Sequence, residues 1–271
     1  RLLGPDGREI EQIVLPVSMR QGDLTQTELE QWLARILSKY AFDIVHINHL
    51  LRFPFSLPHI IQAHGAKIVF SLHDYFAICD VYTLIGFEGH YCDIPNRPPE
   101  TCDVCLERTR NIAIGSQARR IRFVRESFRH IDTVLAGSQT SADILTRMFP
   151  QLTDKVTLLP PPMLHENVSL APRLEDFSVL NIALLGNFTH VKGAEAALEI
   201  FEQAKNLPVT FHIFGRIDPA YAARLETLTT SVIAHGQFKP GELPPKLATC
   251  NAFLMLSPWP ETYCIALSEA Q

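Results

Sequence analysis

Two glutamates near the end of the sequence have the spacing to hold a ligand with two sets of hydroxyls. Glu261 and Glu269 lie eight residues apart in a stretch that reads as a helix over 262–270. Eight helical residues rise about 12 Å, and the backbone N–H groups of 262–264 form an anion site between the carboxylates. A nucleotide-sugar has this layout of sugar hydroxyls, diphosphate and ribose hydroxyls. A capped helix with a surface glutamate also fits the spacing.

The loop LLGNFTHVKG at 184–193 offers a cation for the same ligand. A strand ends at Gly186, whose missing side chain lets the backbone approach a ligand, and Lys192-Gly193 opens the next helix. An anion is stabilised at such a helix end. The motif is not a Walker A loop, because the lysine precedes its glycine and no Ser or Thr follows. A plain loop with a solvated lysine is the alternative.

Strands and helices alternate around these residues. The expected strands are 10–17, 43–48, 67–72, 132–138, 155–160, 179–186, 209–215, 231–236 and 252–257. The expected helices are 25–39 with Thr25 or Thr27 as N-cap, 194–205, 219–230 and one near 242–249. Strands that are apolar on both faces favour parallel sheets covered by helices. We therefore predict an α/β chain of two Rossmann-like domains, 1–165 and 166–271.

The composition excludes several classes of protein. The net charge of −5 argues against nucleic-acid binding, and no apolar run is long enough to span a bilayer. Six cysteines without a secretory signal favour a reducing compartment, so we expect a cytoplasmic protein.

Three motifs occur in order after the second domain's strands: HVKG at 190–193, HG at 235–236 and PETYCIALSE at 260–269. Together they resemble the donor domain of retaining glycosyltransferases of family 4. The resemblance is closest to the branch with HKG and WPET…LSEA motifs, found in bacterial polysaccharide-assembly proteins. It implies a two-domain GT-B fold and metal-independent, hexosyltransferase-type transfer from a nucleotide-diphosphate sugar to a glycan or lipid-linked acceptor.

The resemblance also assigns roles to individual residues. It implies that Glu261 lies beside the transferred sugar. The implied donor-binding residues are Gly186, Lys192, Gly193, Tyr263 and Glu269, with Lys192 on the diphosphate and Glu269 on the ribose. Asn187 departs from the pattern, because many family members carry a diphosphate-binding arginine there.

The first domain resembles the family's acceptor domain at KIVFSLHDYFAICD, whose HD pair follows a strand. The matching residues are His73 and Asp74, placed here in the catalytic site, and His46 and His49 are weaker acceptor-side candidates. The resemblance implies that His73 orients a substrate or stabilises developing positive charge through its backbone. A histidine at a strand end also serves in packing or capping.

The resemblance predicts more chain than the sequence contains. The family's first strand is expected before Arg1 and further strand–helix units after Gln271, so both domains read as incomplete. We expect such a fragment to be inactive and to self-associate through its exposed sheet. The alternative function is a catalytically inactive nucleotide-sugar-binding or scaffold module of a larger assembly protein.

The stretch at 118–131 reads as a basic amphipathic helix. Its arginines at 119, 122, 125 and 129 share one side, and its apolar residues share the other. Such a helix can make a peripheral contact with the inner face of a membrane or with a lipid-linked acceptor. Packing of the apolar side into a core is the alternative.

A cysteine-rich loop at 79–105 is too irregular to build a core. Four cysteines lie within it: Cys79, Cys92, Cys102 and Cys105, the last two as C-x-x-C. Four thiolates can hold one structural zinc, although disulfides or reduced thiols also fit.

Overall fold

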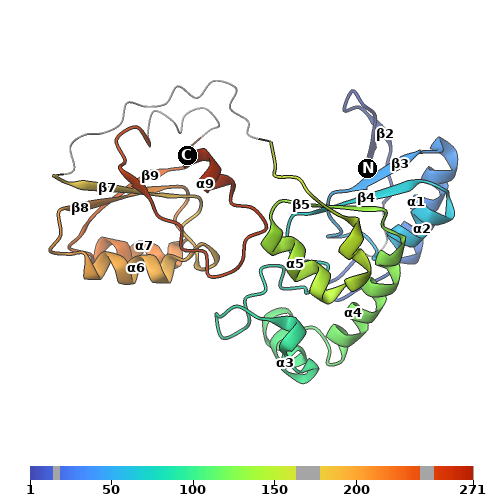
Figure 1. Cartoon of the computed structure of the whole chain (residues 1–271), viewed down its shortest axis with the longest axis horizontal. Coiled ribbons are helices and arrows are strands. Elements are labelled where there is room, and N and C mark those ends of the chain that lie inside the picture. Colours follow the sequence, from blue (N-terminus) through green and yellow to red (C-terminus); the bar gives the residue numbers. More distant parts are fainter. Residues whose placement is uncertain (15–18, 163–177, 239–246, 271) are drawn as a thin grey trace. The chain divides into compact units, whose positions relative to one another are not determined.

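The computed structural model describes residues 1–14, 19–162, 178–238 and 247–270. The chain divides into two compact units, Arg1–Pro160 and Pro161–Gln271 (Figure 1). The domain boundary predicted at residue 165 lies outside the described residues. Each unit contains a parallel four-stranded sheet, so the predicted α/β architecture with two Rossmann-like domains is confirmed.

The sheet of the amino-terminal unit has the strand order β3-β4-β5-β6, and all of its pairs are parallel. Its strands are β3 (Ile44–Ile47), β4 (Lys67–Leu72), β5 (Thr133–Ala136) and β6 (Val156–Leu158). The helices of this unit are α1 (Thr27–Tyr40), α2 (Leu57–Ala63), α3 (Pro99–Arg110), α4 (Ser116–Ser127) and α5 (Gln139–Met148). Consecutive strands are neighbours, so residues that follow β3 and β4 lie at the same sheet edge.

Helix α1 buries one face because its apolar residues recur at helical spacing. Leu29, Trp32 and Ile36 are buried. The predicted N-caps Thr25 and Thr27 are wrong. The cap is Gln26, which has extended backbone angles and accepts the N–H of Leu29 through its side chain at 2.5 Å.

The strand predicted at 10–17 forms only in part where the structure describes it, and it does not belong to the parallel sheet. Strand β2 (Glu9–Glu11) pairs antiparallel with β1 (Leu2–Leu3), apart from the parallel sheet. The turn GPDG at 4–7 joins the two strands, and Gly7 has a φ of +77°. The GPDG turn explains why these residues form a hairpin. Residues 15–17 of the predicted strand lie outside the described ranges.

The sheet of the carboxyl-terminal unit has the order β10-β7-β8-β9 and is also parallel. Its strands are β7 (Leu180–Leu185), β8 (Val209–Phe214), β9 (Ser231–Gly236) and β10 (Ala252–Phe253). Its described helices are α6 (Ala194–Gln203), α7 (Pro219–Glu226) and α9 (Ile265–Ala270). The helix predicted near 242–249 lies mostly outside the described residues. Since β10 pairs directly with β7, the loops that follow these two strands are neighbours.

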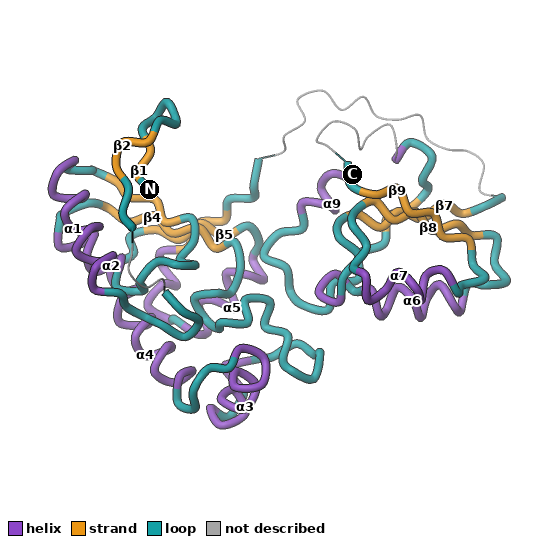
Figure 2. Tube along the Cα trace, turned by 180° about the vertical axis from the view of Figure 1, so that it is seen from behind, coloured by secondary structure: helices purple, strands orange, loops and turns teal. Residues whose placement is uncertain are grey.

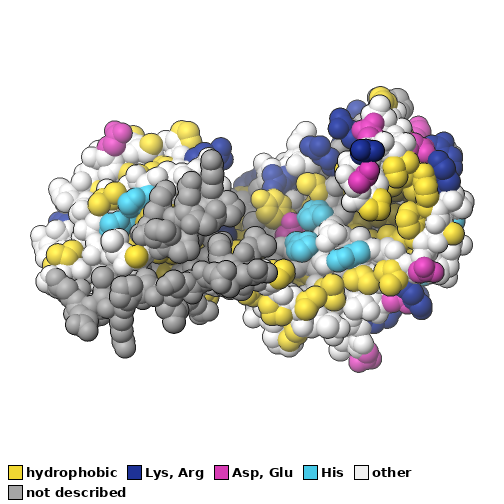
Figure 3. Space-filling view, turned by 90° about the horizontal axis from the view of Figure 1, so that it is seen from above, with side chains coloured by type: hydrophobic (Ala, Val, Ile, Leu, Met, Phe, Trp, Pro, Cys, Tyr) yellow, Lys and Arg dark blue, Asp and Glu magenta, His cyan; other side chains and the backbone are white. Residues whose placement is uncertain are grey.

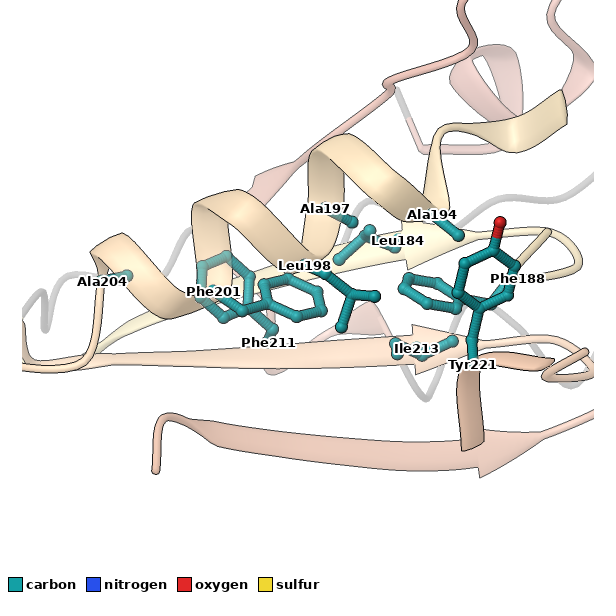
Figure 4. Packing of buried hydrophobic residues seen from close by; sticks show 10 residues of the cluster. All are labelled: Leu184, Phe188, Ala194, Ala197, Leu198, Phe201, Ala204, Phe211, Ile213 and Tyr221. Atoms are coloured by element: carbon teal, nitrogen blue, oxygen red, sulfur yellow. The ribbon is translucent and has the colours of Figure 1, made fainter. Parts of the chain in front are cut away.

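One face of this second sheet is covered by α6 and α7 (Figure 2). Helix α6 contributes Ala194, Ala197, Leu198 and Phe201, whose spacing places them on one side. The ring of Phe201 lies 4.3 Å from that of Phe211 in β8, centroid to centroid. This cluster fixes α6 on the sheet (Figure 4) and thereby fixes the loop that leads into the helix.

Strand β3 forms an edge of the first sheet, and a largely apolar groove of about 580 Å³ runs beside it. Phe42, Ile44 and Phe53 line the groove and are exposed. No helix within the described ranges is long and apolar enough to cross a membrane.

Candidate functional site

A lysine and a glutamate that are 69 positions apart meet at the carboxyl end of the second sheet. The Nζ of Lys192 lies 2.7 Å from Oε1 of Glu261. The Glu261 side chain is only 7% exposed, whereas that of Lys192 is 40% exposed. Ser257 donates its hydroxyl to the same carboxylate oxygen. The carboxylate is therefore fixed, and the lysine is free to turn toward solvent.

Close backbone packing holds the loops that carry this pair. Lys192 ends a short 3₁₀ turn, and Gly193 follows it with a φ of +85°. A Cβ on Gly193 would lie 2.1 Å from the carbonyl oxygen of Leu256, in the loop after β10. A Cβ on Gly215 would lie equally close to the carbonyl oxygen of Gly186. Both contacts require glycine, and they set the loops after β7, β8 and β10 against one another.

One small cavity brings together two of the predicted donor-binding residues, Gly186 and Lys192, with Glu261. Its lining includes Gly186, Asn187, Lys192, Ser257 and Glu261. The structure therefore brings three of the residues predicted from the sequence together. The amide oxygen of Asn187 accepts the backbone N–H of Arg216 at 3.3 Å, which places an exposed arginine beside this cavity wall.

Two predicted donor-binding residues, Gly193 and Tyr263, are not in the lining of this cavity. The hydroxyl of Tyr263 hydrogen-bonds that of Ser268 at 2.7 Å. Glu269 lies in α9, and its side chain is not among those that the structure describes.

The predicted start of the last helix is wrong. Helix α9 begins at Ile265, so residues 262–264 precede it. The sulfur of Cys264 accepts the N–H of Leu267 at 3.3 Å, and its carbonyl accepts that of Ser268. Cys264 therefore caps the helix, and the N–H groups of 262–264 are not those of its first turn.

A second polar group lies at the carboxyl end of the first sheet. His73 and Asp74 follow β4 directly, and a small cavity there is lined by both residues together with Asn48, His49 and Ser71. His73 is exposed. Figure 3 shows histidine side chains (cyan) gathered on one face of this unit, beside apolar side chains.

Asp74 is held by His49, which the sequence suggested only weakly. Nε2 of His49 lies 2.9 Å from Oδ2 of Asp74, and the other oxygen accepts the N–H of Phe76. Nδ1 of His49 accepts the N–H of Leu51, so the neutral ring carries its proton on Nε2, toward the carboxylate. The carboxylate of Asp74 raises the pKa of His49 against a smaller opposing effect of burial. His49 follows β3 and Asp74 follows β4, so the adjacency of these two strands could have predicted the pair.

Sequence reasoning missed a buried arginine beneath this group. Arg120 donates to Asp80 at 2.8 Å and also to the carbonyl of Phe76. Its guanidinium lies beside the stacked rings of Phe55 and Phe76, 4.6 and 4.7 Å from their centroids. Arg120 precedes Val124 by four residues, which places it on the buried side of α4.

The rest of helix α4 agrees with the alternative prediction, in which the apolar side of the helix packs into a core. Val124, Phe128 and Ile131, at its apolar side and just beyond, are fully buried. The four arginines at 119, 122, 125 and 129 are exposed. The apolar side is therefore part of the core, and only the basic side is accessible.

The four loop cysteines line one small cavity. They are free thiols, and burial raises the pKa of Cys79 to about 12 and that of Cys102 to about 11. Among the described side chains, no group of three or more His, Cys, Asp or Glu residues is placed to hold a metal ion. The structural zinc therefore stays a prediction.

Comparison with known proteins matches this chain to a glycosyltransferase family by sequence and to several solved structures by fold. The sequence model of Glycosyltransferase Family 4 matches residues 4–163, more than half of the chain. No curated protein sequence matches the chain.

Several solved structures share the fold. Alr3699/HepE of Anabaena, in complex with UDP, has a TM-score of 0.59 and 13% identity over 90% of this chain and 60% of its own. The lipopolysaccharide outer core galactosyltransferase WaaB has a TM-score of 0.56 and 14% identity, over 90% and 58%. The pneumococcal O-GlcNAc transferase GtfA, with UDP and GlcNAc, has 0.54 and 12%, over 89% and 43%.

The chain thus spans 60% or less of the length of each of these three proteins, and identities this low establish the fold alone. The fold that they share is the GT-B arrangement of two Rossmann-like domains predicted from the sequence. The match of the family model over more than half of the sequence shows that the chain belongs to Glycosyltransferase Family 4.

Proposed function

We propose that this protein is a retaining glycosyltransferase that moves a sugar from a nucleotide-diphosphate donor to a glycan or lipid-linked acceptor in surface polysaccharide assembly. The observation that carries the proposal is the contact between Lys192 and Glu261 in one cavity at the carboxyl end of the second sheet. Ligands of doubly wound sheets bind at this end. Family membership supports the reaction class, and the motifs support the setting.

The two charged groups suit the two parts of a donor. A diphosphate is a stronger anion than a carboxylate, so the exposed Lys192 turns from Glu261 to the diphosphate when the donor binds. Glu261 stays in place through Ser257 and then accepts hydrogen bonds from hydroxyls of the transferred sugar. The pair therefore holds the unliganded site neutral and separates on binding.

In the proposed reaction, the acceptor oxygen bonds to the anomeric carbon while the bond from that carbon to the phosphate oxygen breaks. The acceptor proton passes to the departing phosphate on the same face, so the configuration is retained. The products are a glycoside and a nucleoside diphosphate. Lys192 stabilises the charge that develops on the departing diphosphate, as a divalent metal does in other enzymes. We expect turnover to be unchanged by EDTA.

The amino-terminal unit supplies the acceptor-side residues in this proposal. His73 orients a substrate, and Asp74 holds the turn after β4 through the N–H of Phe76 and through His49. Neither group acts as the base, because the donor phosphate takes the proton.

One observation favours the alternative of a module that binds nucleotide-sugars without catalysis. Asn187 stands at a position where an arginine would contact the diphosphate, and its side chain is bonded to the backbone of Arg216. In the catalytic proposal the exposed Arg216 supplies the missing cation. Arg216→Ala therefore reduces turnover if the protein is an enzyme.

Calorimetry with a panel of nucleotide-sugars, paired with a donor-hydrolysis assay, tests the proposal. UDP-glucose is the first donor to use, since a solved structure with the same fold contains it. Binding together with slow hydrolysis supports the enzyme. In the full-length protein, binding without hydrolysis or transfer supports the inactive module, and no binding across the panel contradicts both.

The acceptor proposal includes a peripheral contact through the basic side of α4. Its apolar side is buried, so the contact is electrostatic. Sedimentation with vesicles of 30% phosphatidylserine, at low and high salt, tests it. Binding that persists in high salt contradicts an electrostatic contact.

The four thiols that share a cavity support a further proposal of one structural zinc. Binding would require the thiols to approach one another and to lose their protons. Elemental analysis of protein purified without a metal-affinity tag decides this: about one zinc per chain supports the site, and none contradicts it.

A further inference from the structure

The loops after β7 and β10 are joined by the indole of Trp259. Its Nε1 donates a hydrogen bond of 3.1 Å to the carbonyl of Val191. Val191 directly precedes Lys192, and Trp259 lies two residues before Glu261. One hydrogen bond therefore links the two segments that carry the charged pair, beside each member of that pair.

This bond differs from the ion pair in what happens when an anion arrives. Lys192 loses its contact with Glu261 if it turns to a diphosphate, so the ion pair cannot keep the two loops together at that moment. The indole bond involves neither charged side chain and persists. The packing of Gly193 against Leu256 gives close contact but no directional bond to the loop backbone.

We propose that Trp259 is a positioning residue for the donor site, acting on Lys192 through the carbonyl of Val191. The inference rests on the proposed function, because it assigns Lys192 to the donor diphosphate. The indole fixes the backbone from which the lysine extends. The lysine can then exchange the carboxylate for the diphosphate by side-chain rotation alone, without movement of the loop.

The other tryptophan of the sequence provides a matched control. Trp32 donates its Nε1 to Glu11 at 3.0 Å in the amino-terminal unit. Trp→Phe at either position keeps an aromatic ring and removes one indole hydrogen bond. We expect Trp259→Phe to weaken UDP or UDP-glucose binding roughly tenfold, the effect of one lost hydrogen bond. Trp32→Phe leaves this affinity unchanged.

A double-mutant cycle separates positioning from general stabilisation. Trp259→Phe acts through Lys192, so in a Lys192→Ala background it causes no further loss of donor affinity. A merely structural role gives the full additional loss there. Wild-type affinity in Trp259→Phe, or a loss that adds in full to that of Lys192→Ala, overturns the inference.

Hydrogen exchange of the loop at 187–193 tests the same role without a donor. Amides of this loop exchange faster in Trp259→Phe than in wild type and in Trp32→Phe. If wild type binds no nucleotide of the panel, the proposed function fails, and the exchange experiment still decides whether Trp259 orders the loop. Equal exchange in all three proteins overturns that role.

Discussion

The Lys192–Glu261 and His49–Asp74 pairs occupy similar places in two similar sheets, but they rest on different supports. Each pair joins the loops that follow two adjacent parallel strands. The first is fixed mainly by backbone contacts, with glycine against a carbonyl and an indole on another carbonyl. The second lies above stacked rings and a buried ion pair.

The supports of the second pair form a continuous chain of contacts. The ring of His49 stacks on Phe76 at 5.6 Å, and Phe76 contacts the guanidinium of Arg120, which is paired with Asp80. Damage to this support is therefore expected to destabilise the whole unit, whereas damage to the first pair is expected to change mainly the proposed donor binding. The two sites can therefore be separated by measuring stability and donor affinity in the same variants.

The largest effect is expected from Arg120→Ala. It leaves Asp80 buried at 5% side-chain exposure without its cation, which costs roughly 3–5 kcal/mol of unfolding free energy. Urea unfolding measures the loss, and Arg119→Ala, one residue away and exposed, is the control with an effect near zero. A loss below about 1 kcal/mol would show that the buried pair is not the support of this site.

Lys192→Ala is expected to weaken donor binding and to leave the stability almost unchanged. Loss of a charged contact to the diphosphate weakens donor binding by roughly 1.5–3 kcal/mol, or about 10- to 150-fold. Calorimetry with UDP-glucose measures this, with the exposed Lys205→Ala as control. Equal donor affinities in the two variants contradict the diphosphate role.

Glu261 and Glu269 are expected to have different roles within the proposed donor site, and their variants can be compared directly. Glu269→Ala is expected to weaken nucleotide binding by roughly 1–3 kcal/mol, because it removes the charged acceptor proposed for the ribose hydroxyls. Glu261 faces the transferred sugar in the proposed site, so Glu261→Ala is expected to lower kcat more than donor affinity. Titrations with UDP and with UDP-glucose, combined with kinetics, distinguish these roles. If both variants keep wild-type affinity and rate, the assignment is wrong.

The smallest effect is a pH dependence confined to the first unit. Asp74 raises the pKa of His49 in the folded state, so the imidazolium contributes stability that is fully present below about pH 6.5. That contribution is lost as the pH rises above 6.5 through the folded pKa. The unfolding free energy of wild type minus that of His49→Gln therefore falls between pH 6 and 9.

A His90→Gln variant gives the control for this titration, since His90 is exposed in the same unit. NMR titration of the His49 ring reports its pKa directly. A difference in stability that is flat with pH, or a ring pKa below that of a free histidine, would contradict the pairing.

Much of the fold followed from periodicity and glycine placement. The runs KIVFSL and VTFHIF became β4 and β8, because continuous apolar segments bounded by polar residues are typical of buried parallel strands. The helix after Lys192-Gly193 also formed as expected, and Ala194, Ala197 and Phe201 pack its apolar face on the sheet. These features depend on neighbours along the chain, which the sequence displays.

The wrong predictions concern two helix starts and one hairpin, where alternative local hydrogen bonds compete. Gln26 caps α1 although two threonines flank it, and Cys264 caps α9, which begins three residues later than predicted. The hairpin at β1 and β2 replaced part of a predicted sheet strand because the GPDG turn brought Leu2–Leu3 back onto it. Alternative caps and turns differ in free energy by about 1 kcal/mol, and the spacing of residues in the sequence does not predict so small a difference.

The sequence by itself determined which loops carry charged and glycine residues. From these loops it predicted that Lys192 and Glu261 contribute to the same donor site. Only the tertiary structure decided their contact. Pairing of β10 with β7 brings together loops 69 positions apart in the chain, and the carbonyl of Leu256 leaves room for no side chain at Gly193. The same holds for Arg120, whose type predicts a surface residue. Its burial depends on an aspartate 40 positions away and on two phenylalanine rings, which offset the cost of removing its charge from water.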